Sequence, residues 1–169
     1  MNQPQMNIVL YEPEIPFNTG NIGRTCVATR TRLHLIEPLG FKLNEKAIQR
    51  AGLDYWDQLD LSIYCCFQDF LDQNPGARLY MATTKAQKMY TEVKYEPGCY
   101  LMFGKESAGI PEEILVEYQE ACVRIPMWGE IRSLNLSNSV SIVLFEALRQ
   151  NGFYGLEAKG QLHRLEWSR

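Results

Sequence analysis

The residues that could do chemistry gather in three segments rich in Gly, Asn and Ser, and these are YEPEIPFNTGNIGR (11–24), GKESAGIP (104–111) and MWGEIRSLNLSNS (127–139). Serine hydroxyls and asparagine amides bond backbone or ligand groups without carrying charge, and glycine lets a backbone approach a ligand closely. Each segment is therefore either a ligand cradle or ordinary loop chemistry. In isolation, a turn at Asn18 and a helix cap at Asn135 or Ser137 are the simpler interpretations.

Charged residues within these segments also have simple interpretations. Glu106 could cap the helix expected from about Pro111, or it could bond a backbone amide. Arg24, taken alone, is typical of a solvated surface arginine. The joint occurrence of these residues, in three segments that each follow an apolar run, favours a functional site.

The composition disfavours several classes of protein. Only two histidines occur, His34 and His163, far apart in the chain, which gives little support for a zinc site or a Ser-His-Asp triad. Five cysteines form no C-x-x-C pair, so we expect reduced thiols in the cytoplasm. The net charge of −3 provides no basic field over the whole protein, so an RNA partner must be met by a local patch. No apolar run approaches the ~18 residues of a membrane helix.

Two nucleotide-binding signatures are absent. The segment 20–23 lacks the first pair of tight-turn glycines of a dinucleotide fingerprint. GCYLMFGK (98–105) superficially resembles a phosphate-binding loop, but its residues 100–103 are an apolar strand and Glu106 stands where Ser or Thr is needed.

The elements that must position the three segments alternate between strands and helices. Short apolar runs predict strands at 6–11, 33–37, 61–65, 78–83, 100–103 and 121–126. These runs are mostly continuous, which is typical of parallel strands covered on both faces. One helix from 136 to about Gly152 should bury a stripe made of Leu136, Val140, Val143, Leu144, Ala147 and Leu148. The pattern predicts an α/β fold with a mostly parallel sheet flanked by helices, in which the three segments form loops at one edge. We expect one domain over 1–169, with a core of about 6–151, a short flexible N-terminus and a C-terminal tail.

Taken together, NTGNIGR (18–24), LMFGKESAGIP (101–111) and IPMWGEIRSLNLSNSVS (125–141) resemble the three motifs of the SPOUT family of knotted RNA methyltransferases, in order and spacing. The resemblance extends from about Met6 to Gln150. With RAGLDYW (50–56) included, the chain resembles in particular the small TrmL type, which methylates the tRNA wobble position. The resemblance implies a deep trefoil knot formed by the loops around 104–111 and 126–137. Knots are so rare in proteins that the residue pattern alone would exclude one.

The resemblance also implies a reaction and a site. A methyl group would pass from S-adenosylmethionine, leaving S-adenosylhomocysteine, to the ribose 2′-hydroxyl of the wobble cytidine or uridine (position 34) of tRNA, with leucine tRNAs as the expected substrates and no metal. The implied cofactor contacts are Ala82, Gly104, Ile125, Ser133 and Leu134. The implied catalytic residues are Arg24, first as a phosphate grip that aligns the hydroxyl, and Asn135. Asn18 and Arg132 are expected to meet RNA. The alternatives are another tRNA position or rRNA as the target, or an RNA-binding module without catalysis.

Two further expectations concern a second set of basic residues that could contact RNA and the oligomeric state of the protein. Lys42, Lys46 and Arg50 recur at every fourth residue, so on a helix they would share one face that contacts RNA or is merely solvated. The resemblance implies a homodimer built on the first and last helices, which would bring Arg24 near the partner's cofactor site. Phe145 could serve the core or that interface. We expect a cytoplasmic protein that binds neither membrane nor DNA.

Overall fold

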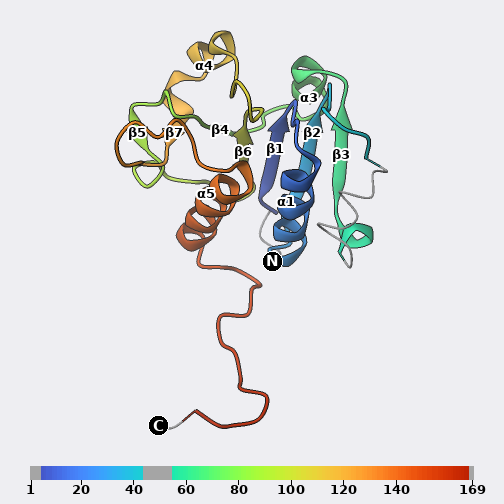
Figure 1. Ribbon diagram of the computed structural model, residues 1–169, viewed down its shortest axis with the longest axis vertical. Helices are drawn as coiled ribbons and strands as arrows, with labels where there is room; N and C mark the ends of the chain where they lie inside the picture. Colours follow the sequence, from blue (N-terminus) through green and yellow to red (C-terminus); the bar gives the residue numbers. More distant parts are fainter. Residues whose placement is uncertain (1–4, 44–54, 168–169) are drawn as a thin grey trace.

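The computed structural model describes residues 5–43 and 55–167, and these form one twisted sheet with helices on both faces (Figure 1). The strands found there are β1 (Asn7–Tyr11), β2 (Arg32–Ile36), β3 (Leu61–Tyr64), β4 (Leu79–Ala82), β5 (Lys88–Met89), β6 (Tyr100–Phe103) and β7 (Cys122–Arg124). They are ordered β3-β2-β1-β6-β4-β7-β5, and every neighbouring pair is parallel. The predicted parallel α/β fold is confirmed.

Helices cover the sheet in two layers. The described helices are α1 (Pro16–Ala28), α3 (Phe67–Gln73), α4 (Glu112–Glu117) and α5 (Leu136–Gln150), with short 3-10 helices η1 (Trp56–Gln58) and η2 (Gln119–Ala121). In Figure 1, α1 and α5 lie in front of the sheet, and their side chains pack on one face of it, whereas those of α3 and α4 pack on the other. Pro16 suits the first position of α1, where no intrahelical N–H bond is lost.

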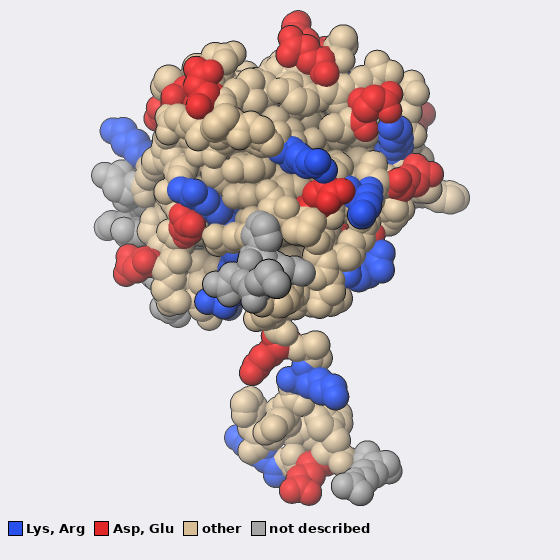
Figure 2. Space-filling view, turned by 180° about the vertical axis from the view of Figure 1, so that it is seen from behind, with Lys and Arg blue, Asp and Glu red and all other residues tan. Residues whose placement is uncertain are grey.

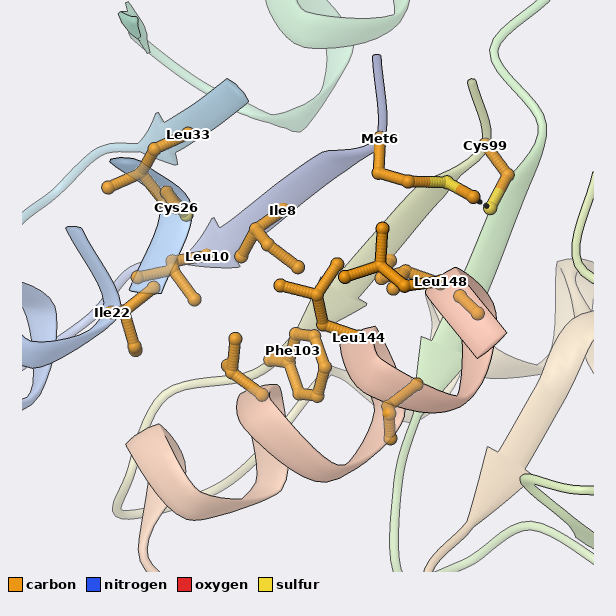
Figure 3. Close-up of a cluster of buried hydrophobic side chains, with 14 of the residues drawn as sticks. Met6, Ile8, Leu10, Ile22, Cys26, Leu33, Cys99, Phe103, Leu144 and Leu148 are labelled. Atoms are coloured by element: carbon orange, nitrogen blue, oxygen red, sulfur yellow. Dashed lines mark hydrogen bonds between the residues drawn. The ribbon is translucent and has the colours of Figure 1, made fainter. Parts of the chain in front are cut away.

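The core explains why the apolar runs are continuous. Along β1, Ile8 and Leu10 enter the cluster under α1 and α5, whereas Val9 between them enters the cluster under α3 and α4. Figure 3 shows the first cluster, in which side chains of β1 meet Ile22 and Cys26 of α1 and Leu144 and Leu148 of α5. Successive strand residues point to opposite faces, so a strand covered on both sides needs apolar residues throughout.

One expectation about elements is corrected, and one strand was not predicted. NTGNIGR does not form a loop, because residues 18–24 lie within α1. Gly23 serves packing: a Cβ placed on it would lie 3.2 Å from the Trp56 ring, so η1 approaches α1 closely because this residue is a glycine. The two-residue strand β5 was not predicted, since so short a run carries no periodicity. The six predicted strands and all six buried residues of α5 are as expected.

The C-terminal tail begins after α5 and runs away from the sheet (Figure 1). Leu156 still packs against the core, whereas the large apolar side chains farther along are exposed, with Leu165 at 76% and Trp167 at 71%. None of the helices in the described ranges has the length and apolar character of a membrane span. The trefoil knot stays a prediction.

Candidate active site

The carboxyl ends of β4, β6 and β7 open into a pocket of about 480 Å³. Ala82 ends β4, Gly104 follows β6, Ile125 follows β7, and Ser133 and Leu134 precede α5. All five residues expected to contact the cofactor line this one pocket. Segments far apart in sequence therefore meet at the edge where ligands bind in open parallel sheets.

The loop after β6 folds back on itself. Lys105 and Gly109 form an antiparallel bridge, in which the N–H of Gly109 donates to the carbonyl of Lys105 at 2.8 Å. A Cβ placed on Gly104 would lie 2.0 Å from the carbonyl carbon of Gly109. Gly104 is thus required by its own loop, which is a different reason from the close ligand approach expected for it.

The segment after β1 is clamped to this loop by charged groups. Lys105 donates to the carboxylate of Glu12 at 2.8 Å, which raises the pKa of Lys105. Ser107 donates from its hydroxyl and its backbone N–H to the two carboxylate oxygens of Glu14, each at 2.8 Å. These two hydrogen bonds lower the pKa of Glu14, so the carboxylate form is favoured. The loop after β6 is held to the start of α1 at two points.

Glu106 caps α1, a role that differs from the expected cap on the helix near Pro111. Its carboxylate accepts from the backbone N–H groups of Glu14 and Ile15, at 2.8 and 3.2 Å, and from the side chain of Asn18 at 3.0 Å. The N-cap residue of α1 makes no side-chain cap bond, and the first turn holds no acidic residue. A carboxylate from another loop therefore serves the positive end of this helix. The alternative that Glu106 bonds backbone amides is confirmed.

Asn135 is the N-cap of α5, as the simpler interpretation predicted. Its Oδ1 accepts from the backbone N–H groups of Ser137 and Asn138, at 2.9 and 3.4 Å. Its Nδ2 donates to Oδ1 of Asn18 at 3.0 Å. A chain of hydrogen bonds therefore runs from Glu106 through Asn18 to Asn135 and links the beginnings of α1 and α5 beside the pocket.

The cations expected to meet RNA are only partly brought together. Arg132 lines the pocket, whereas Arg24 lies on an exposed position of α1, outside the pocket lining, with its guanidinium over the Tyr55 ring. Lys42 is exposed and also lies outside the lining. Lys46 and Arg50 lie outside the described residues. On the face seen in Figure 2, basic and acidic side chains are interspersed without a broad patch of one sign.

Several lining residues were not among the predicted contacts, and these are Thr83, Thr84, Lys85, Lys105 and Glu106, although the last two lie in the candidate segment GKESAGIP. They directly follow β4 or β6, so their position after a predicted strand was the available signal. Lys85, which lines the pocket, pairs with Glu112 of α4 at 2.8 Å. In the described ranges no three His, Cys, Asp or Glu side chains cluster as metal ligands would.

A parallel α/β sheet with a pocket at its carboxyl edge defines the class of open α/β proteins, in which ligands bind beyond the carboxyl ends of the strands. Within that class, this chain belongs to the SpoU rRNA methylase family, whose model matches residues 5–145. The SPOUT resemblance is confirmed.

Relatives with more narrowly described activities cover most of the chain. The tRNA (cytidine(34)-2′-O)-methyltransferase of Escherichia coli (strain K12) is 48% identical over 151 residues, which cover 89% of this chain and 96% of that protein. A solved structure described as "Structural insights into the 2-OH methylation of C/U34 on tRNA" matches with a TM-score of 0.84 and 43% identity, over 88% of this chain and 97% of the other. An AdoMet-bound rRNA methyltransferase from Sinorhizobium meliloti matches with a TM-score of 0.79 and 26% identity, over 88% of this chain and 57% of the other.

Proposed function

We propose that this protein transfers a methyl group from S-adenosylmethionine to the ribose 2′-hydroxyl of cytidine or uridine at position 34 of tRNA. The observation that carries the proposal is the pocket at the carboxyl edge, which gathers Ala82, Gly104, Ile125, Ser133 and Leu134 from four segments. The Escherichia coli relative, a tRNA (cytidine(34)-2′-O)-methyltransferase, is the basis for the assigned substrate. We extend the proposal to leucine tRNAs, to the cytoplasm, and to one methyltransferase domain over the whole chain.

The pocket suits this cofactor in size and chemistry. Its volume of about 480 Å³ lies within the usual range for ligand pockets. Ala82, Ile125 and Leu134 are half-buried apolar residues that can pack an adenine ring, and the hydroxyls of Thr83 and Ser133 can bond polar groups. When bound, S-adenosylmethionine supplies a methyl group on a positively charged sulfur.

The chain's own residues would act mainly by positioning. The ribose hydroxyl must be held within ~3–3.5 Å of the methyl group and in line with the leaving sulfur. Arg24 is protonated at neutral pH and can grip a phosphate oxygen while it aligns the hydroxyl. Asn135 uses both ends of its amide within the protein, so we assign it a positioning role through Asn18. Arg132, at the pocket rim, is assigned to RNA phosphate.

A second copy of the chain would complete the site. Arg24 lies outside the lining of its own pocket. Large apolar side chains are exposed on the adjoining helices, with Phe17 of α1 at 58% and Phe145 of α5 at 47%. Apolar patches of this kind mark interaction surfaces. We infer that α1 and α5 pack against the same helices of a partner and bring each Arg24 to the opposite pocket.

The reaction is tested by transfer of labelled methyl to tRNA from cells that lack this gene, followed by nucleoside mapping. We expect label as a 2′-O-methylated pyrimidine at position 34 of leucine tRNAs. Arg24→Ala should lose activity at least a hundredfold while it still binds cofactor, an effect on the order of 3 kcal/mol. Arg78→Ala, which removes an exposed ion pair with Glu96 at the other end of β4, is the matched control and should remain active. Label only in rRNA or at another tRNA position would overturn the assigned substrate, and no label in any RNA would overturn the reaction.

The shared site is tested by subunit complementation. Arg24→Ala and Ile125→Arg chains, each expected to be inactive alone, are co-expressed under two affinity tags. If Arg24 acts on the partner's pocket, the mixed dimer contains one pocket with both residues intact and recovers up to half of the activity. No recovery in a mixed dimer that binds one cofactor would show that Arg24 serves its own pocket.

A further inference from the structure

Tyr55, near the end of the segment RAGLDYW, has no role in the site described so far. The guanidinium carbon of Arg24 lies over the Tyr55 ring, 5.2 Å from its centroid. This distance is within the ~6 Å range of cation–π attraction. Within residues 5–43 and 55–167, this ring is the only side-chain partner found for Arg24. Among the described residues, the ring is therefore what orients the guanidinium.

Contact with the ring leaves the N–H donors of the Arg24 guanidinium available for a substrate. An aromatic face attracts the cation through its quadrupole and accepts no conventional hydrogen bond from the N–H groups. A carboxylate partner would occupy two of the five N–H donors, whereas the ring leaves the planar fork available for phosphate or hydroxyl oxygen. A ring contact is thus the kind of support that a substrate-gripping arginine can use.

The position of Tyr55 is fixed by close packing beside Arg24. A Cβ placed on Gly23 would lie 3.2 Å from Cζ3 of Trp56 and 3.3 Å from Cδ2 of Leu59. The absence of a side chain at Gly23 therefore lets η1 dock directly on α1, one residue before Arg24 in sequence. Tyr55 immediately precedes η1, so this docking carries its ring to the guanidinium.

We propose that Tyr55 is a positioning residue that orients Arg24 for RNA through the face of its ring. The proposal rests on the function proposed above, because Arg24 is there the residue that grips the RNA. Its specific content is that the ring matters and the hydroxyl does not, since the Tyr55 hydroxyl has no hydrogen-bond partner among the described residues.

The test compares three substitutions at one position in steady-state methyl transfer to tRNA. Tyr55→Phe and Tyr55→Trp keep an aromatic face and should retain kcat within about twofold of the wild type. Tyr55→Leu removes the face and should lower kcat about two- to fivefold, the range of exposed cation–π contacts. The melting temperature and the cofactor Kd should be the same in all four proteins. Equal kcat in Tyr55→Leu and Tyr55→Phe would overturn the proposal, whether both match the wild type or both lose activity. A loss of kcat that follows the melting temperature would overturn it as well.

A second readout does not depend on catalysis. Ring current from Tyr55 should shift the Arg24 Hδ resonances upfield in NMR spectra, with the assignment made by their loss in Arg24→Lys. Tyr55→Phe should keep this upfield shift, and Tyr55→Leu should abolish it. If the wild type methylates no RNA, the proposed function fails, and the spectra still decide whether Tyr55 holds Arg24. Arg24 resonances that are unchanged in Tyr55→Leu would overturn the inference whatever the activity.

Discussion

Asn135 donates from its side-chain nitrogen to Oδ1 of Asn18 across 3.0 Å, although 117 positions separate the two residues. The nitrogen of Asn18 faces the carboxylate of Glu106 at 3.0 Å. Since a carboxylate only accepts, this contact fixes which end of the Asn18 amide points each way. Asn18 is only 4% exposed, so neither bond can be replaced by water without rearrangement. The orientation of one buried amide thus ties α1 to α5.

Asn18→Asp should make stability depend on pH. The new carboxyl would lie beside Glu106, and like charges raise the pKa of such a pair in the folded state. The folded protein then holds a proton that the unfolded chain releases near pH 4, so the free energy of unfolding falls as pH rises above that value. We expect a loss on the order of 2 kcal/mol at pH 7.5 and a smaller loss at pH 5, measured by urea unfolding. Asn18→Ala, which adds no charge, is the control. Equal deficits at both pH values in Asn18→Asp would contradict the proposed orientation.

Asn135 combines two roles that substitutions can separate. Asn135→Ser keeps a helix cap for α5 but loses the donation to Asn18, whereas Asn135→Ala loses both. We expect the free energy of unfolding of Asn135→Ala to be about 1 kcal/mol lower than that of Asn135→Ser, which is the usual contribution of a helix cap. Both should lose methyl transfer to a similar extent, because both free the Asn18 amide. Thermal unfolding and methyl-transfer rates measure the two effects, and full activity in the Ser variant would show that the bridge to Asn18 is dispensable.

The parts of the fold that sequence predicted are those with local periodicity. The run at β1 is apolar at every position because Ile8 and Val9 face opposite layers. The stripe of α5 follows from the spacing of residues such as Val140 and Leu144, which are fully buried. In both elements the burial pattern repeats along the sequence, so a single sequence is sufficient to place them.

The parts that sequence missed depend on contacts between distant segments. Residues 18–24 contain two glycines and two asparagines, which disfavour helix, yet they lie in α1, which packs Ile22 into the core and whose start is bonded by Glu106 from the loop after β6. Gly104 lines the pocket where a cofactor contact was predicted, but the backbone of Gly109 and Ile110 also requires a glycine there, which the sequence did not predict. The local sequence around α1 does not predict the contact with Glu106, and the local sequence around Gly104 does not predict its close approach to Gly109. The pocket residues themselves were predicted from a family resemblance rather than from spacing.

Gly104→Ala should disrupt the pocket from within the loop. The added methyl would meet the carbonyl carbon of Gly109 at 2.0 Å and the nitrogen of Ile110 at 2.2 Å, and backbone atoms cannot rotate away. We expect a loss of at least ~2 kcal/mol of stability and loss of cofactor binding, followed by thermal unfolding and calorimetry. Gly160→Ala, whose new methyl would meet nothing within 4 Å, is the matched control. A Gly104→Ala protein that melts with the wild type and binds cofactor equally would refute this account of the loop.

His34 lies in the core of the sheet in a network that defines its protonation. Asn7 directs its amide nitrogen to backbone carbonyls, so its Oδ1 accepts from Nε2 of His34 at 3.1 Å. Nδ1 is then the unprotonated nitrogen, and it accepts from the hydroxyl of Tyr64 at 2.8 Å. Asn74 donates to the same hydroxyl at 3.2 Å, which leaves the hydroxyl proton for the histidine. The neutral form is therefore built into the core.

Acid should weaken the protein through His34. Burial, and secondarily the nearby charge of Arg32, lowers the pKa of His34 from its ordinary 6.5 to about 4. Its contribution to stability is complete above pH 6.5, and it is lost as pH falls toward 4, because the unfolded state binds the proton first. The fall amounts to on the order of 3 kcal/mol. His34→Gln cannot titrate, so the difference in free energy of unfolding between wild type and variant should shrink across this window while both proteins share every other titrating group. Urea unfolding between pH 4 and 7 measures this difference. A constant difference across the window would mean that His34 takes up its proton without cost in the folded state, against the network that holds it neutral.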